Sequence, residues 1–385
     1  MTKKWSSRLT FFAFVVLMVG LGSNDSLRGI FSTIFQEHFS LTTTQLGLIV
    51  TASYIGNLVF LLVGGNLSTR FSKKRVLQVL ILIWMAALAL FAFTSNYTVL
   101  LIGMALALGS STLLNTTMNL ITPLLFATAP GFFVNFLFFT QEIGTSGSQY
   151  ILGSHANGFA FWQHTNLVLL ILGAVAFVLL LFCNVPEEAA DPADAPAQKG
   201  GYDWRIIVPY VLVFGFYFIA EHGVMNWMVA YGVDGLGLPQ ASAAKYLSVF
   251  FGGMMIGRLC LSPLVDKLGA LKSLAAFGGV SCVLYLIGSV TMPVWAISGL
   301  SFSILYPTLV MSIRLYFPAQ QVSGAAGTIL SIASLADILF NVGFGKLVDM
   351  AGYAVSIRVL PLSALAFFIV FMLFTKFCKP TQKLK

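Results

Sequence analysis

The sequence predicts an all-α membrane protein with twelve transmembrane helices in two pseudo-symmetric six-helix bundles. Three observations predict this fold. Of the 385 residues, 58% are hydrophobic and only 9% are charged, whereas soluble chains carry about 25% charged residues. The long apolar runs do not alternate with polar residues, so they indicate helices rather than the strands of a barrel. A single long polar connection divides these runs into two equal sets.

Apolar segments long enough to cross a bilayer as a helix, about 20 residues each, follow one another along the chain. The first half contains six of them, at 9–31, 44–66, 76–95, 98–123, 131–153 and 165–184. The second half contains six more, at 206–231, 245–265, 271–291, 294–316, 322–347 and 356–377. The first run follows basic residues, as in a signal peptide, but lacks a cleavage site of small residues, so we expect it to be the first span.

The polar connection defines the expected domain boundaries. It is rich in proline and acidic residues and cannot bury apolar area, so we expect a flexible cytoplasmic linker at 185–204. The six-helix bundles would then cover 1–184 and 205–385. The loops after the second and the eighth span resemble each other, because Arg70 aligns with Lys267 and Arg75 with Lys272. Two parallel six-helix repeats are typical of a large class of transporters.

The distribution of charge predicts the orientation in the membrane. The chain has 21 Lys and Arg against 13 Asp and Glu, and the basic residues cluster before the first span, after the second and after the last. Short loops rich in Lys and Arg stay on the cytoplasmic side. We therefore expect a multi-pass protein of the cell membrane with both termini in the cytoplasm. The bilayer then accounts for this charge, and no nucleic-acid partner is expected.

The four cysteines give no sign of a metal site. Cys183, Cys260, Cys282 and Cys378 lie within or at the ends of apolar runs, without a CxxC motif or paired histidines. Neither a metal nor another cofactor is expected. The chain also lacks a Walker motif, which excludes transport driven by its own ATP hydrolysis. No Ser/His/Asp or Cys/His set indicates an enzyme.

The loop after the second span carries a family motif. Residues that match the pattern G-x-x-x-D-R/K-x-G-R/K-R/K are Gly65, Arg70, Lys73 and Lys74, whereas Thr69 stands in place of Asp and Ser72 in place of Gly. The second copy keeps Asp266, Lys267 and Gly269. With its twelve spans the chain resembles the major facilitator superfamily over nearly its whole length. The resemblance implies a transporter that works as a monomer. For Arg70, Arg258 and Asp266 we expect structural or gating roles.

Finer features resemble the fucose permease-like branch of sugar and proton symporters. They are Asn24-Asp25 in the first span, Asn119 and Asn135 followed by Gly144, the series Ala220-Glu221, Trp227 and Tyr231, and Tyr306-Pro307-Thr308. In that branch the aspartate of the Asn-Asp pair takes part in proton coupling. The chain departs from the branch at Asn115, where an acidic residue is usual, and at Phe138, where a polar residue is usual.

Four acidic residues fall within predicted spans: Asp25, Glu142, Glu221 and Asp337. A charge at a span centre costs about 2.5–3.5 kcal/mol unless it is paired or hydrated. We therefore expect these carboxyl groups to bind and release protons. The alternative is that each is held in an ion pair. Arg28 would then neutralise Asp25, Arg258 or Arg314 would pair with Asp337, and Arg258 would act as a latch near the cytoplasmic end of its span.

Polar side chains on several spans are candidates for contacting a solute. They are Asn24, Asn115, Asn119, Asn135, Gln141, His222, Asn226 and Trp227. Amides suit the hydroxyl groups of a sugar, and an indole can stack on the C–H face of a pyranose. The alternative for each amide is to hold helices together, and for Trp227 it is simple packing.

These features predict a secondary active transporter that moves a small polar solute, a monosaccharide, together with protons by alternating access. One alternative is a proton-coupled exporter of amphipathic compounds on the same fold, for which the 35 phenylalanines would suit an apolar pocket. A membrane receptor or scaffold is a second alternative, disfavoured because no sizeable domain lies outside the predicted spans.

Overall fold

The computed structural model describes residues 3–126, 130–186 and 202–380. Every regular element within these ranges is a helix. The N-terminal half comprises α1 (Lys3–Ile30), α2 (Ser32–Phe39), α3 (Thr43–Arg70), α4 (Lys73–Phe93), α5 (Tyr97–Leu125), α6 (Pro130–His155) and α7 (Phe159–Phe182). The C-terminal half begins with α8 (Trp204–Ala230), the π-helix η2 (Tyr231–Gly235), α9 (Gln240–Leu268) and α10 (Ala270–Gly288). It continues with α11 (Met292–Ile297), α12 (Gly299–Phe302), α13 (Leu305–Ser312), the 3-10 turn η3 (Ile313–Leu315), α14 (Ala319–Ala351), α15 (Tyr353–Ser356) and α16 (Val359–Phe377).

The helical segments confirm the predicted class of fold. Eleven of them within the described ranges are long and apolar enough to cross a membrane. The remaining long helix is α6, whose sequence includes the polar run Thr140-Gln141-Glu142. The span predicted at 294–316 is built from α11, α12, α13 and η3 rather than from one unbroken helix. The span predicted to begin at 165 begins at Phe159, directly after Gly158.

Side-chain caps fix where several helices begin. The Asn96 side chain accepts a hydrogen bond from the backbone N–H of Val99 at the start of α5. Asp203 accepts one from the N–H of Arg205 at the start of α8. Such caps satisfy N–H groups that have no partner within the helix. Polar residues that separate two apolar runs in the sequence thus set the helix boundaries.

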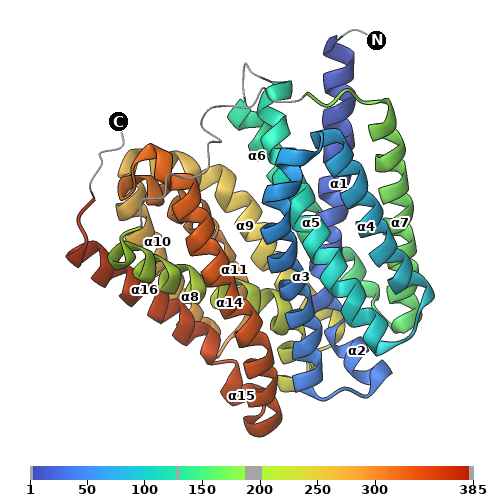
Figure 1. The fold of residues 1–385 in the computed structure, drawn as a ribbon. Coiled ribbons are helices and arrows are strands. Elements are labelled where there is room, and N and C mark those ends of the chain that lie inside the picture. Colours follow the sequence, from blue (N-terminus) through green and yellow to red (C-terminus); the bar gives the residue numbers. More distant parts are fainter. Residues whose placement is uncertain (1–2, 127–129, 187–201, 381–385) are drawn as a thin grey trace.

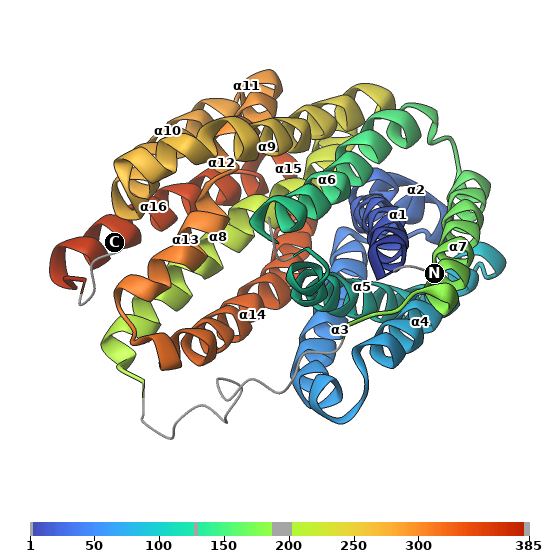
Figure 2. The ribbon, with the colours of Figure 1, turned by 90° about the horizontal axis from the view of Figure 1, so that it is seen from above.

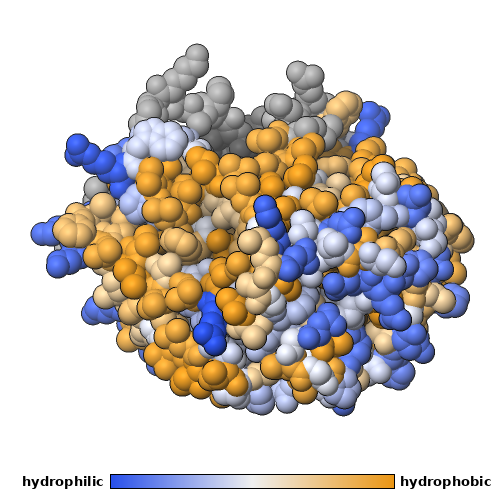
Figure 3. All heavy atoms as spheres, turned by 90° about the horizontal axis from the view of Figure 1, so that it is seen from below, coloured by the Kyte–Doolittle hydropathy of each residue, from blue (hydrophilic) through white to orange (hydrophobic). Residues whose placement is uncertain are grey.

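The two halves lie side by side. Figure 2 shows the blue-to-green helices of the N-terminal half on one side and the yellow-to-red helices of the C-terminal half on the other. In Figure 1 the first helix starts at the top, and the short helices α2 and α15 lie at the bottom. Figure 3 looks onto this α2/α15 end and shows hydrophilic side chains gathered over part of it, next to hydrophobic surface.

Each half buries large aromatic side chains in its own core. Trp84 and Trp162 are fully buried in the N-terminal half. In the C-terminal half the Tyr285 and Tyr217 rings stack on Phe302 at centroid distances of 5.1 Å and 5.0 Å. These contacts stay within one half, so each half is internally well packed. Motion between the halves would leave them intact.

The halves meet mainly along two helix pairs, α3 with α14 and α6 with α9. Glycines allow this close approach, since a Cβ atom added at Gly47 or Gly345 would collide with a backbone oxygen of the facing helix. At the α2/α15 end, the Asp349 carboxylate accepts hydrogen bonds from the backbone N–H groups of Thr43 and Thr44, each 2.8 Å long. A residue of one half thus caps the first turn of a helix of the other half.

The described hydrogen bonds and ring contacts between the halves stop about midway along these helices. They reach Tyr54 on α3 and Glu142 on α6. Beyond that level α3 continues to Arg70, and α6 extends back to Pro130. The halves are therefore fastened at the α2/α15 end and at mid-depth.

Some sequence predictions fall outside the described residues. Most of the expected linker at 185–204 lies in 187–201, so the proposed domain boundaries stay predictions. The side chains of Arg70, Asn135 and Asp266 also lie outside the described part of the chain.

The cap that Asp349 forms on α3 of the other half yields a prediction about the equilibrium between the closed and the open α2/α15 end. Replacing Asp349 by Ala removes three hydrogen bonds that join the halves at the α2/α15 end. We expect the halves to separate there more often. Electron paramagnetic resonance distances between spin labels at Gln45 and Met350 should show a larger long-distance population.

The matched control is Asp203→Ala, which removes a cap within the C-terminal half only. It should leave the Gln45–Met350 distances unchanged. An unchanged distribution in the Asp349→Ala variant would show that this cap does not hold the halves together.

Candidate functional site

Asp25 lies on α1 where this helix faces α5. One of its carboxylate oxygens accepts a hydrogen bond of 3.3 Å from the hydroxyl of Ser111. The other oxygen is buried and has no hydrogen-bond partner among the described residues. A buried carboxylate with so few partners is poorly stabilised in its charged form. Asp25 therefore has the environment of a group that can take up a proton.

Arg28 lies one helical turn after Asp25 and is 6% exposed. Its guanidinium sits over the ring of Tyr54, 5.8 Å from the ring centre, and interacts electrostatically with the Asp25 carboxylate. The structure shows no ion pair between the two side chains. The alternative was that Arg28 permanently neutralises Asp25. Only the longer-range electrostatic interaction between the two side chains supports it.

Asp337 on α14 pairs with His222 on α8. The carboxylate lies 2.8 Å from the imidazole Nδ1, and the Asp337 side chain is 2% exposed. The prediction that Arg258 or Arg314 pairs with Asp337 was wrong. His222 faces Asp337 from the neighbouring helix, and Arg314 is exposed. The imidazole also stacks with two rings, those of Phe218 in its own half and Tyr54 in the other.

Glu142 and Arg258 form an ion pair across the two halves. The Arg258 guanidinium donates to a Glu142 carboxylate oxygen, and the side chains are 27% and 12% exposed, respectively. The second Glu142 oxygen is buried without a partner. The latch role expected for Arg258 near the end of its own span is therefore revised: this residue connects α9 to α6 at mid-depth.

Glu221 lies near this ion pair without joining it. Its carboxylate interacts electrostatically with Arg258 and with Glu142. It is partly exposed, and no described residue forms an ion pair with it. Arg258 thus bonds to a carboxylate of the other half and interacts at longer range with a carboxylate of its own half.

A chain of amides runs from α5 to α6. Asn119 donates a hydrogen bond of 2.6 Å to the side-chain oxygen of Asn115. Asn115 in turn donates one of 2.7 Å to the side-chain oxygen of Gln141. All three side chains are partly exposed. The fold brings these three predicted residues together, and their amide groups can donate hydrogen bonds to the hydroxyl groups of a solute and accept hydrogen bonds from them.

Three other candidates serve packing in this conformation. Asn24 accepts a hydrogen bond from the buried indole of Trp84. Asn226 is 2% exposed and donates to the Tyr54 hydroxyl. Trp227 is fully buried, donates to Asn341 at 2.8 Å and packs on Phe344. The expectation that Trp227 stacks on a sugar ring is corrected here, because neither face of its indole is open.

Tyr54 and Ser111 are the site residues that the sequence reasoning missed. Tyr54 contacts Arg28, His222 and Asn226, so it connects the charged groups of both halves. A weak signal existed, since Ser111 lies four residues before Asn115 and so shares its helix face. Nothing in the sequence distinguished Tyr54 from the other tyrosines.

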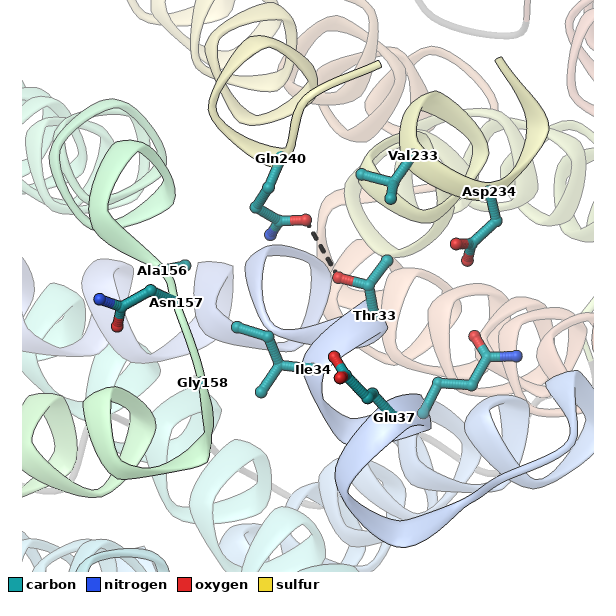
Figure 4. A pocket seen from close by; sticks show the side chains of 10 residues that line it. Thr33, Ile34, Glu37, Ala156, Asn157, Gly158, Val233, Asp234 and Gln240 are labelled. Atoms are coloured by element: carbon teal, nitrogen blue, oxygen red, sulfur yellow. Dashed lines mark hydrogen bonds between the residues drawn. The ribbon is translucent and has the colours of Figure 1, made fainter. Parts of the chain in front are cut away.

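A separate pocket of about 510 Å³ opens at the α2/α15 end. Figure 4 shows Glu37 and Asp234 pointing into it from opposite halves, and a hydrogen bond from Thr33 to Gln240 crosses between the halves. The residues that line it do not include the charged groups of mid-depth. It is a vestibule at the closed end rather than part of the central site.

The ion pair between Glu142 and Arg258 yields a stability prediction. Removing one partner of a buried ion pair costs about 3–5 kcal/mol. Because this pair is partly exposed, we expect Glu142→Gln and Arg258→Gln each to cost about 2 kcal/mol. The double variant should recover part of the loss, since neither charge is then left alone. Thermal unfolding of the purified variants measures this coupling, and strictly additive shifts in Tm would contradict it.

Comparison with known proteins identifies the family. The family model of the Major Facilitator Superfamily matches residues 10–336. The cis,cis-muconate transport protein of Acinetobacter baylyi is 24% identical over 297 residues, which cover 71% of this chain and 70% of that protein. The L-fucose-proton symporter of Escherichia coli is 23% identical and covers 93% of this chain and 90% of its own. The crystal structure of the transporter FucP in the outward conformation superposes with a TM-score of 0.66 at 20% identity, over 96% of this chain and 99% of that one. The chain belongs to the Major Facilitator Superfamily and is a membrane transporter rather than an enzyme.

Proposed function

We propose that this transporter moves a monosaccharide-like solute across the cell membrane together with a proton, and that Asp25 carries the proton. A relative that covers nine-tenths of the chain is a proton symporter for a sugar. The proposal depends on the surroundings of Asp25. One of its carboxylate oxygens is buried without a hydrogen-bond partner, and the other has only a 3.3 Å bond to Ser111. Glu142 and Asp337 also have one buried oxygen each without a hydrogen-bond partner, but their other oxygens have a direct ionic partner. Glu221 has no ionic partner among the described residues but is partly exposed.

The positions of the contacts suggest how the halves move. The halves are fastened at the α2/α15 end and at mid-depth. By the positive-inside rule, the basic residues at the other end support a cytoplasmic location for that end and for both termini. The structure then corresponds to a state closed toward the outside. Opening of the outer end requires that the Asp349 cap and the Thr33–Gln240 bond break.

The charged residues of the interface supply the coupling. In the outward state Asp25 takes up a proton and loses its charge, which lowers the cost of closing the outer end around it. The amides Asn115, Asn119 and Gln141 bind the hydroxyl groups of the solute. Arg258 then restores its bond to Glu142 as α6 and α9 come together. Release of solute and proton into the cytoplasm completes the cycle. Arg70 and Asp266 keep their predicted gating roles.

The Asp25→Asn variant tests the proposal. A neutral amide mimics the protonated carboxyl group and cannot release a proton. In proteoliposomes that contain the variant, uphill uptake of the transported sugar should disappear, so that the inside-to-outside concentration ratio falls to about one. Exchange of labelled for unlabelled sugar should persist. A protonophore should reduce wild-type accumulation to the same level.

Glu37→Gln is the control, since Glu37 is an exposed acid in the vestibule. It should accumulate sugar like the wild type. Undiminished uphill uptake by Asp25→Asn would refute the role of Asp25. Extrusion of amphipathic dyes without any sugar uptake would favour the exporter instead.

A further inference from the structure

Arg28 is a buried guanidinium for which the described residues supply no ionic partner. The residue is 6% exposed, and its Nε is buried without a hydrogen-bond acceptor. Its described contact is the face of the Tyr54 ring, at 5.8 Å. Neither terminal nitrogen donates to a described residue. This side chain differs from Arg258, which bonds directly to Glu142.

A buried charge is normally paired, because removing it from water is costly. A guanidinium has five N–H donors in a planar fork, whereas an aromatic face satisfies none of them directly. Asp25 lies one turn away and interacts with Arg28 only through space. Once Asp25 is protonated, even that compensation is lost. Arg28 is therefore left with unused donors in the state that binds the solute.

The group that fits these donors is a carboxylate. The fork of an arginine binds a carboxylate through two parallel hydrogen bonds, and such charge-assisted bonds are short and strong. Elsewhere at mid-depth, hydrogen-bonding groups are present on the Tyr54 hydroxyl, His222 and the amides of Asn115 and Gln141. A solute that uses both kinds of group carries a carboxylate at one end and hydroxyl groups along the rest.

We propose that Arg28 binds the carboxylate of the transported solute, and that the solute is a sugar acid rather than a neutral sugar. This inference rests on the proposed function, since it names the class of solute for the same site. It also assigns Arg28 as the residue that decides between an acidic and a neutral sugar. Two observations support it: Arg28 is more than nine-tenths buried as a residue, and its Nε is buried without a hydrogen-bond acceptor.

The charges then balance during transport. A proton on Asp25 adds one positive charge to the site, and the bound carboxylate adds one negative charge next to Arg28. The loaded site therefore carries the same net charge as the empty site with Asp25 ionised. Uptake of a sugar acid with one proton moves no net charge across the membrane. Uptake of a neutral sugar with one proton would move one positive charge inward.

Binding tests the class of solute directly. The purified full-length protein is heated in the presence of D-glucuronate, D-galacturonate, D-glucose or D-galactose, each acid being matched to a sugar that differs only at carbon 6. A ligand bound to the folded state raises Tm. We expect the acids to raise Tm and the neutral sugars to do so at least ten-fold less potently.

Variants of Arg28 test the residue. Arg28→Gln should weaken binding of the stabilising acid at least ten-fold. Arg28→Lys keeps the charge but not the fork, so it should weaken binding by a smaller factor and serves if the Gln variant does not fold. Arg8→Gln is the matched control, because Arg8 is an exposed arginine on the same helix. It should bind the acid like the wild type.

The electrical readout in proteoliposomes separates the two proposals. Uptake of the stabilising acid should respond to a pH gradient but not to a potential set with potassium and valinomycin. If the neutral sugars bind and are taken up with protons while the acids are not, the role of Arg28 is overturned and the proposed function stands. Full acid binding by Arg28→Gln also overturns it. If neither acids nor sugars bind or drive proton uptake, the proposed function itself fails, and the sugar acid with it.

Discussion

The cost of holding charge inside a membrane protein constrains this molecule more than any other interaction. The mid-depth region between the halves contains Asp25, Arg28, Glu142, Glu221, Arg258 and Asp337, together with His222. Each charge must be paired, hydrated or neutralised by a proton. Two ion pairs form in this conformation, Glu142 with Arg258 and Asp337 with His222. Asp25, Arg28 and Glu221 have no ionic partner among the described residues, and of these Asp25 and Arg28 are where we place the proton and the anionic group.

The pairings differ in what they join. Asp337 and His222 lie on α14 and α8 of the same half, so their bond survives relative motion of the halves. Glu142 and Arg258 lie on opposite halves, so their bond forms only when α6 and α9 are close together. Tyr54 contacts groups of both halves. A change of charge at Asp25 can therefore alter the strength of contacts that form and break as the halves move.

Much of the fold could be predicted from the sequence, because membrane-spanning helices need long apolar runs and leave a strong signal. The predicted spans match helices such as α3 and α10, and the family motif after α3 supported the same fold. Helix ends were harder to predict, since α7 begins at Phe159, where aromatic residues continue the helix past the apolar window.

The four intramembrane acids were found because charge is rare in such runs. Their partners were not, because pairing depends on which helices become neighbours. Arg258 illustrates this, as it bonds to a residue 116 positions away. Trp227 shows the opposite difficulty, since an aromatic residue in a span looks the same whether it packs or binds.

We propose that the carboxyl group of Asp25 gains and loses a proton while Glu142 and Asp337 keep their ionic partners. Infrared difference spectroscopy of the purified protein across a pH titration detects this protonation, since a protonated carboxyl group has a C=O band that a carboxylate lacks. We expect a titrating carboxyl band that is present in the wild type and in Glu142→Gln and absent in Asp25→Asn. A band that persists unchanged in Asp25→Asn, or that disappears only in Glu142→Gln, would contradict it.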